Sequence, residues 1–147
     1  FFFQAQHGIR DPLWSRGLGD VYKRQILGQD FIPLNVNHGE NYFANGYRID
    51  DFSYISDCSY IPKDTMKKIE GSKIIVLDAL RQGRKHKSHL SLEESIELIL
   101  ELKPKLAYFT DACHDIDHND TNEFLEIISE KTNIKMQMAF DGLSIKI

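Results

Sequence analysis

Lys73-Ile-Ile-Val-Leu77, followed directly by Asp78, is the stretch of sequence that decides the fold. A short run of aliphatic, mostly β-branched residues that ends at a polar residue is typical of a strand buried on both faces. We therefore expect a strand over residues 73–77 in the interior of a layered α/β arrangement.

Helical and strand patterns alternate after this stretch. Ser91-Leu-Glu-Glu94 has the form of a capping box and predicts a helix that ends before Pro104. An apolar strand is expected next, over residues 106–110. The remaining predicted elements are a helix from Asp120 to Lys131 and a terminal hairpin of residues 134–140 and 143–147 around Asp141-Gly142.

The segment before Lys73 predicts strands first and a helix second. Residues 31–36 read as a strand, and residues 46–49 and 52–56 flank Asp50-Asp51 as a hairpin. Pro62 can open a helix that runs to Glu70. The sequence contains no internal repeat, so we expect one small domain over residues 26–147.

Residues 1–25 are predicted to be of non-native origin. Ser15-Arg-Gly-Leu-Gly-Asp-Val-Tyr-Lys-Arg-Gln25 back-translates codon by codon to a common transposase-type sequencing adapter, and Gly8-Ile-Arg-Asp11 fits the primer that precedes it. We expect the natural sequence to begin near Ile26, in the middle of a longer protein, and exclude the preceding residues from fold reasoning.

Charge and composition exclude some classes of function. Residues 1–25 carry four basic and two acidic side chains, so without them the formal net charge changes from −4 to −6. Nonspecific nucleic-acid binding needs a basic surface and is not expected. No apolar run reaches the roughly 20 residues of a membrane helix. Cys58 and Cys113 are expected to be reduced thiols in a cytoplasmic protein.

Polar side chains suited to chemistry gather at predicted strand ends and in the loops that follow. Imidazoles mixed with carboxylates suit zinc, iron or manganese, whereas each residue alone is more simply a cap or a solvated side chain. The set is His38, Asp57, Asp78, His86, His89, Asp111, His114, Asp115 and His118.

The order of these motifs resembles the metallo-β-lactamase-fold metallohydrolases, in the branch that contains the bacterial cyclic phosphodiesterase of phosphonate breakdown. The resemblance covers residues 31–147 and implies the C-terminal half of an αββα sandwich. It is carried by His38-Gly39, Gly46-Tyr-Arg-Ile49, Tyr54-Ile-Ser-Asp57, Ile75-Val-Leu-Asp78, His86-Lys-Ser-His89, Leu106-Ala-Tyr-Phe-Thr110, His114-Asp115 and Phe140-Asp-Gly142.

Family roles follow from the resemblance at matching positions. His38 matches a metal-binding histidine, Asp57 the carboxylate that bridges two metal ions, and His89 a catalytic acid or phosphate contact. The implied cofactors are two divalent ions, zinc or manganese. The implied substrate is a small-molecule or nucleotide-like phosphodiester, attacked by a metal-activated water. The resemblance also allows a homodimer of the parent protein.

One departure from the family pattern concerns the last metal ligand. Many relatives have Thr-His-x-x-His where this chain has Thr110-Asp-Ala-Cys-His114. Either Asp111 replaces the ligand, which would favour a harder metal such as manganese, or His114 is the ligand; we favour His114. Asp78 is assigned to a structural bond behind the ligands, with a ligand role as the alternative.

A second departure is an absence. The principal family motif, His-x-His-x-Asp-His, does not occur upstream of His38, and we attribute its loss to the adapter. We therefore expect this chain to bind divalent metal weakly, to lack catalysis, and to expose apolar surface that the parent protein would bury.

Two alternatives belong to other functional classes. A phosphorylation receiver would use Asp50, Asp51 and Asp57, but it needs five parallel strands and the predicted hairpins oppose it. A non-catalytic α/β interaction module that lost its metals would scatter the histidines, whereas the hydrolase hypothesis requires His38, Asp57 and His114 to converge.

Overall fold

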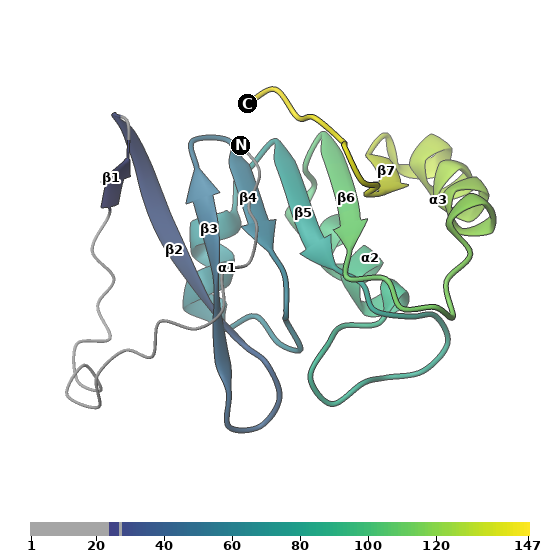
Figure 1. Ribbon diagram of the computed structural model, residues 1–147. Helices are drawn as coiled ribbons and strands as arrows, with labels where there is room; N and C mark the ends of the chain where they lie inside the picture. The colour runs from purple at the N-terminus through teal and green to yellow at the C-terminus, as the bar shows by residue number, and fades with distance from the viewer. Residues whose placement is uncertain (1–23, 27) are drawn as a thin grey trace.

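The computed structural model describes residues 24–26 and 28–147 (Figure 1). Seven strands and three helices follow one another along this part of the chain. Their bounds are β1 Arg24–Ile26, β2 Gln29–Asn37, β3 Phe43–Ile49, β4 Phe52–Ile55, α1 Lys63–Ile69, β5 Ile74–Asp78, α2 Leu92–Leu102, β6 Leu106–Thr110, α3 His118–Thr132 and β7 Lys135–Met138.

All seven strands form one mixed sheet in sequence order, from β1 to β7. The pairs from β1 to β4 are antiparallel, and the pairs from β4 to β7 are parallel. Two reversals lie between β2 and β4, so β2 runs in the same direction as β4, β5 and β6. The carboxyl ends of these four strands therefore meet at one edge of the sheet.

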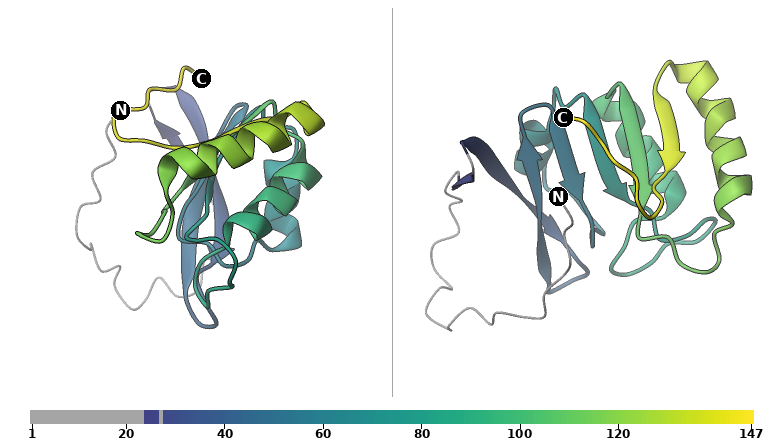
Figure 2. Two further views of the ribbon diagram at one scale, coloured as in Figure 1. Left: turned by 90° about the vertical axis from the view of Figure 1, so that its right-hand side faces the viewer. Right: turned by 45° about the horizontal axis from the view of Figure 1, so that its top comes forward.

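The hydrophobic core lies between the sheet and the helices. Ile69 from α1, Ile99 from α2 and Leu125 from α3 belong to the same buried cluster as Leu77 and Phe109 from the central strands. Figure 2 shows the helices against the sheet from two further directions. The helix that follows Ser91 has the predicted capping box, in which the Ser91 hydroxyl accepts from the Glu94 N–H.

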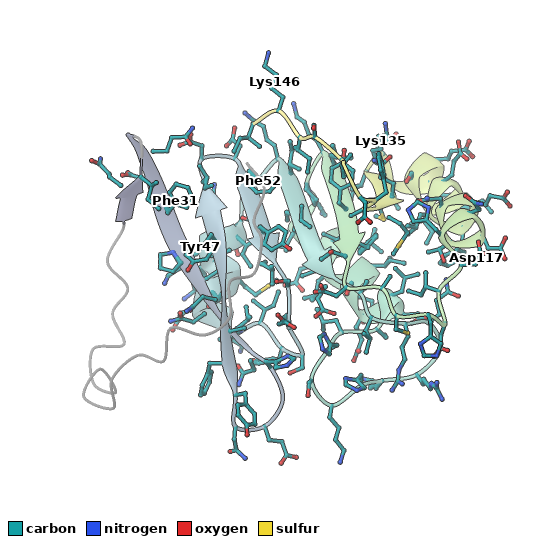
Figure 3. All side chains as sticks on the ribbon, viewed as in Figure 1. Phe31, Tyr47, Phe52, Asp117, Lys135 and Lys146 are labelled. Carbon is teal, nitrogen blue, oxygen red and sulfur yellow. The ribbon has the colours of Figure 1, made fainter. Side chains whose placement is uncertain are left out.

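The opposite face of the sheet carries apolar side chains that no helix of the described residues covers. One registered row across the sheet consists of Pro33, Tyr47, Tyr54, Val76 and Tyr108. Tyr47 and Tyr54 are 43% and 41% exposed. Tyr47 is labelled in Figure 3 with Phe31, whose ring it meets edge to face at 6.4 Å between centroids. The described chain thus leaves part of an aromatic sheet face in contact with solvent.

Strand β7 lies at the edge of the sheet, and α3 packs alongside it. The Met136 N–H donates to Ser129 Oγ at 2.9 Å, and the Met138 N–H donates to Asn122 Oδ1 at 2.8 Å. Both acceptors are side chains of α3. Helix α3 therefore supplies hydrogen-bond partners to backbone groups of the edge strand.

Most predicted elements are confirmed. The strand at 73–77, the strand at 106–110, the helix after Pro62 and the hairpin around Asp50-Asp51 all form, and their largest shift is the start of the first hairpin strand, at Phe43 in place of Gly46. The antiparallel β2–β4 segment also excludes the receiver architecture. No helix among residues 24–26 and 28–147 is long and apolar enough to cross a membrane.

The prediction of a terminal hairpin was wrong. Residues 135–138 form β7, which pairs in parallel with β6, and residues 143–147 form no strand. Pairing with β6 brings Met136 and Met138 into the hydrophobic core. The turn at Asp141-Gly142 does form, with the Leu143 N–H bonded to the Phe140 carbonyl.

The predicted start of the last helix was also wrong. The helix begins at His118, and its N-cap is Asp117, whose side chain accepts from the Asn119 and Asp120 N–H groups. Both Asp117 and Asp120 are acceptable cap residues, and the earlier one forms the cap. The adapter prediction falls mainly on residues 1–23, which lie outside the described residues.

Gly46 provides a test of the register between β3 and β4. A Cβ at this position would lie 2.5 Å from the Tyr54 carbonyl oxygen, which is backbone and cannot rotate away. We expect Gly46→Ala to lower the free energy of unfolding by about 2 kcal/mol. Urea denaturation measures this, with Asn45→Ala, at an exposed neighbouring position, as the matched control. Equal midpoints for the two variants would contradict the close strand approach.

Candidate functional site

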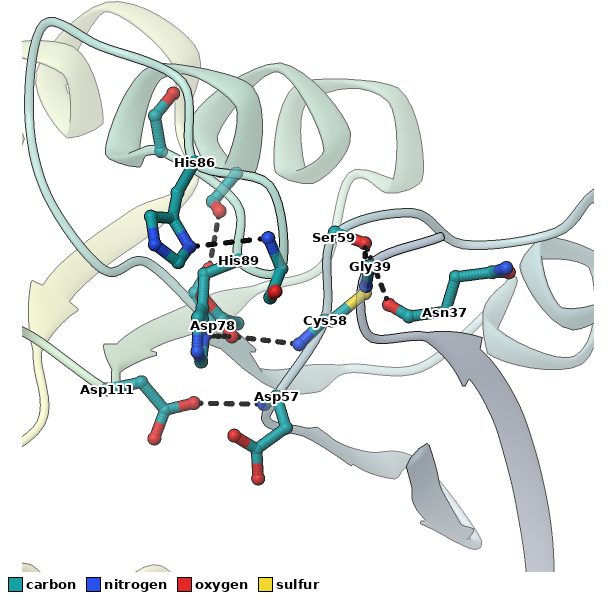
Figure 4. A network of polar contacts seen from close by, with 12 residues as sticks. Asn37, Gly39, Asp57, Cys58, Ser59, Asp78, His86, His89 and Asp111 are labelled. Carbon is teal, nitrogen blue, oxygen red and sulfur yellow. Dashed lines mark hydrogen bonds and ion pairs between the residues drawn. The ribbon is translucent and has the colours of Figure 1, made fainter. Parts of the chain in front are cut away.

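Four chemistry-bearing residues lie at the common carboxyl edge of the sheet. His38 follows β2, Asp57 follows β4, Asp78 ends β5 and Asp111 follows β6. His89 comes from the loop before α2 and approaches the same edge (Figure 4). Because the strands that precede four of these residues run in one direction, residues far apart in sequence meet in one place.

Asp57 and Asp111 share an uncommon backbone conformation. Their φ angles are 52° and 63°, in the left-handed region that Asp visits more readily than most residues. The Asp57 N–H donates to Asp111 Oδ2 at 3.2 Å. The chain therefore turns sharply after β4 and after β6, and the two turns are linked by a direct hydrogen bond.

Asp78 is fully buried and holds His89. One oxygen, Oδ2, accepts from the Cys58 N–H at 2.8 Å and lies 2.6 Å from His89 Nδ1. This contact occupies Nδ1 and leaves Nε2 of the same ring for other partners. Asp78 thus sets the orientation of the His89 imidazole.

His38 completes the cluster from the other side. Its ring meets the His89 ring edge to face, with 4.8 Å between centroids. The following residue is held by a hydrogen bond from the Gly39 N–H to Ser59 Oγ at 2.9 Å. His38 Nδ1 is buried, yet it has no hydrogen-bond partner within the described part of the chain.

The donor atoms fit a divalent metal ion. Ligand atoms of His38, Asp57 and His89 lie within 4.8 Å of one another, and so do those of Asp78, His89 and Asp111. The unpartnered His38 Nδ1 and an unpartnered buried Asp78 oxygen, Oδ1, are the kind of atoms that a cation would satisfy. Mixed imidazole and carboxylate donors suit zinc, iron or manganese.

His114 does not join these two groups. Its side chain is 93% exposed, and its possible ligand atom lies with those of Cys113 and Asp115. The preference for His114 over Asp111 as the last ligand therefore gains no support from the geometry. The structure brings Asp111 to the site instead.

Basic side chains of the loop after β5, residues 81–87, form ion pairs and hydrogen bonds that stabilise the loop. Arg84 pairs with Asp115 at 3.1 Å, and Lys85 pairs with Glu94 at 2.7 Å. Arg81 donates to carbonyl oxygens of its own loop, those of Arg84 and Lys85. The positive charges next to His89 thus stabilise the loop.

Burial shifts the acid–base properties of the site. Burial raises the pKa of Asp78 to about 6, against the opposing effects of the Cys58 N–H and His89. Burial also raises the pKa of Asp111, and the charge of Asp57 adds to this rise. The pKa of the Cys58 thiol rises to about 12 for the same reason, so Cys58 is a neutral thiol near pH 7.

Sequence reasoning missed the pairing of Asp78 with His89. It assigned Asp78 a structural role and placed His89 in the site without a partner. A carboxylate at the end of a buried strand must find hydrogen-bond donors, and the strand-end position was the available signal. The histidine eleven residues later could not be selected from the other loop residues by sequence alone.

A mixed sheet with helices on one face and a His/Asp cluster at its carboxyl edge defines an α/β domain with a candidate metal site. The family model described as the beta-lactamase superfamily domain matches residues 23–111. This is more than half of the chain, and the chain belongs to that superfamily.

Solved structures agree with this assignment. A diphosphatase from the PhnP family is 35% identical, with a TM-score of 0.75, over 84% of this chain and 46% of that chain. The metallo-beta-lactamase fold protein YhfI from Bacillus subtilis is 14% identical, with a TM-score of 0.67, over 82% of this chain and 49% of that chain. The chain thus spans slightly less than half the length of both and has a partial metallo-β-lactamase fold.

A match to a curated protein is more distant. The octanoyltransferase of Porphyromonas gingivalis is 24% identical over 75 residues, which is 51% of this chain and 15% of that protein. So small a share of that protein carries no argument about the activity of this chain.

The raised pKa of Asp78 predicts a pH-dependent stability. The unfolded carboxyl loses its proton near pH 3.8 and the folded one near pH 6, so the folded state holds the proton more tightly between these values. The contribution of Asp78 to stability therefore falls as pH rises from about 4 to about 6, by roughly 2–3 kcal/mol. Asp78→Asn should remove this slope in urea denaturation curves measured from pH 4 to pH 7.

The matched control is Asp64→Asn, at an exposed position on α1. Its curve should run parallel to that of the unchanged chain over the whole pH range. If the Asp78→Asn curve also runs parallel, the ionisation of Asp78 is not perturbed by folding.

Proposed function

We propose that this chain is the C-terminal part of a metal-dependent hydrolase that cleaves a phosphodiester or diphosphate ester. The observation that carries the proposal is the convergence of His38, Asp57, His89 and Asp111 at one edge of the sheet. The name of the 35% identical relative, a diphosphatase, supports a phosphate ester as the substrate class. Membership of the superfamily supports hydrolysis as the reaction class.

The proposed metal ligands are His38, Asp57 and Asp111. Asp57 is the residue proposed to bridge two ions, because it lies between His38 in one donor group and Asp111, to which its own N–H donates. When bound, divalent ions would lower the pKa of an attacking water and neutralise charge on the phosphate oxygens.

His89 is the proposed proton donor to the leaving alkoxide. Its Nδ1 is held by the Asp78 carboxylate, so Nε2 is the ring atom that can face the substrate. Asp78 fixes the orientation of the imidazole without contacting the substrate. A histidine held in this way can act as a general acid.

The 147-residue chain should bind divalent metal ions weakly and should not turn over substrate. It lacks a His-x-His-x-Asp-His motif, so it supplies only part of a two-metal ligand set. Isothermal titration with zinc should give dissociation constants above about 1 μM. Cys113→Ser is included as a control for zinc taken up by Cys113, His114 and Asp115. Stoichiometric submicromolar binding of two zinc ions would contradict this prediction.

The decisive experiment uses the longer protein, obtained by recovering the DNA upstream of the Ile26 codon. With manganese or zinc it should hydrolyse bis(p-nitrophenyl) phosphate or a nucleotide diphosphate ester. His89→Gln should lower kcat by about 100-fold or more. His118→Gln, at the start of α3, is the matched control and should retain activity.

An upstream frame that encodes an intact domain half without metal ligands would overturn the hydrolase proposal. The non-catalytic interaction module would then be the better description. A longer protein that hydrolyses both substrates equally with and without His89 would overturn only the role assigned to that residue.

A further inference from the structure

We infer that Asp111 sets the metal preference of this site and shifts it from zinc toward hard cations, of which manganese is the test case. This inference rests on the proposed metal site. It follows from the residue type at position 111 and from how the structure places that residue.

The position of Asp111 makes its carboxylate a ligand candidate. Asp111 directly follows β6, whose last residue, Thr110, is registered with Asp78 on β5. Its left-handed backbone turns the chain at the sheet edge, and its Oδ2 accepts the Asp57 N–H at 3.2 Å. The carboxylate is therefore held next to Asp57 and Asp78, and it forms a donor group with Asp78 and His89.

The edge is rich in negative charge that lacks a matching positive charge. Asp57, Asp78 and Asp111 lie together, and His89 is the one side chain of the described residues that forms an ion pair with any of them. The nearby loop cations are committed elsewhere, Arg84 to Asp115 and Lys85 to Glu94. A divalent cation is the countercharge that three clustered carboxylates require.

The donor atoms determine which cation fits best. Of the proposed ligands, Asp57 and Asp111 offer carboxylate oxygens and His38 offers an imidazole nitrogen, so oxygen donors outnumber nitrogen donors. Carboxylates suit manganese and magnesium, whereas imidazoles favour zinc, copper and nickel. A histidine in place of Asp111 would add one more imidazole nitrogen and remove one negative charge. Asp111 should therefore weaken zinc binding relative to manganese binding.

The test compares manganese and zinc binding to the 147-residue chain and to its Asp111→His variant. Free manganese is quantified by electron paramagnetic resonance, and zinc by calorimetry. All variants carry Cys113→Ser, because Cys113, His114 and Asp115 bring possible ligand atoms within 4.8 Å and could take zinc themselves. Asp64→His, at an exposed site on α1, is the matched control for an added imidazole.

We expect Asp111→His to raise the ratio of zinc affinity to manganese affinity by about tenfold or more, and Asp64→His to leave the ratio unchanged. Asp111→Asn, which keeps the shape and removes the charge, should weaken manganese binding. Urea denaturation of each variant establishes that it is folded.

Two negative outcomes separate the inference from the proposed function. If Asp57→Asn abolishes metal binding but Asp111→His leaves the ratio unchanged, the metal site stands and the inference is overturned. If neither metal binds, or if Asp57→Asn has no effect on binding, the proposed metal site and the inference both fail.

Discussion

The site depends on the common direction of four strands. The Asp50-Asp51 hairpin and the preceding β2–β3 reversal bring β2 into the same direction as β4, β5 and β6. If only one of these reversals were present, His38 would lie at the opposite edge from Asp57, Asp78 and Asp111. The hydrogen bonds from the Asp57 N–H to Asp111 and from the Cys58 N–H to Asp78 then link the end of β4 to the ends of β6 and β5. Strand direction thus decides which residues can meet, and these hydrogen bonds to carboxylates hold them together.

Sequence patterns predicted this architecture well where local signals agreed with tertiary packing. The apolar strand before Asp78 and the capping box at Ser91 were recovered because each carries its own physical signature. The prediction of a terminal hairpin was wrong although Asp141-Gly142 does form a turn. The preceding residues pair with the edge of β6 and not with the C-terminal tail. The turn preference of two residues does not predict whether the adjoining strand pairs with its neighbour in sequence or with a strand far away in sequence.

The candidate site was predictable in composition but not in pairing. Strand-end position selected His38, Asp57, Asp78 and Asp111, which the structure places at one edge of the sheet, but also His114, which it places elsewhere. Asp111 and His114 lie three positions apart in the loop after β6. Hydrophobic periodicity and secondary-structure propensity do not show which of the two side chains faces the site. The left-handed turn at Asp111 places it beside Asp57, while the chain carries His114 outward into solvent.

The side chains of α3 that bond to β7 have a consequence for assembly. A sheet can recruit a further strand only where backbone donors and acceptors are free at its edge. The side chains of Ser129 and Asn122 already accept hydrogen bonds from the N–H groups of Met136 and Met138. These two donors are therefore not free to pair with an added strand. Within the described residues, strand addition at the β7 edge is therefore disfavoured. The same helix that completes the core also limits how copies of this chain can join into a continuous sheet.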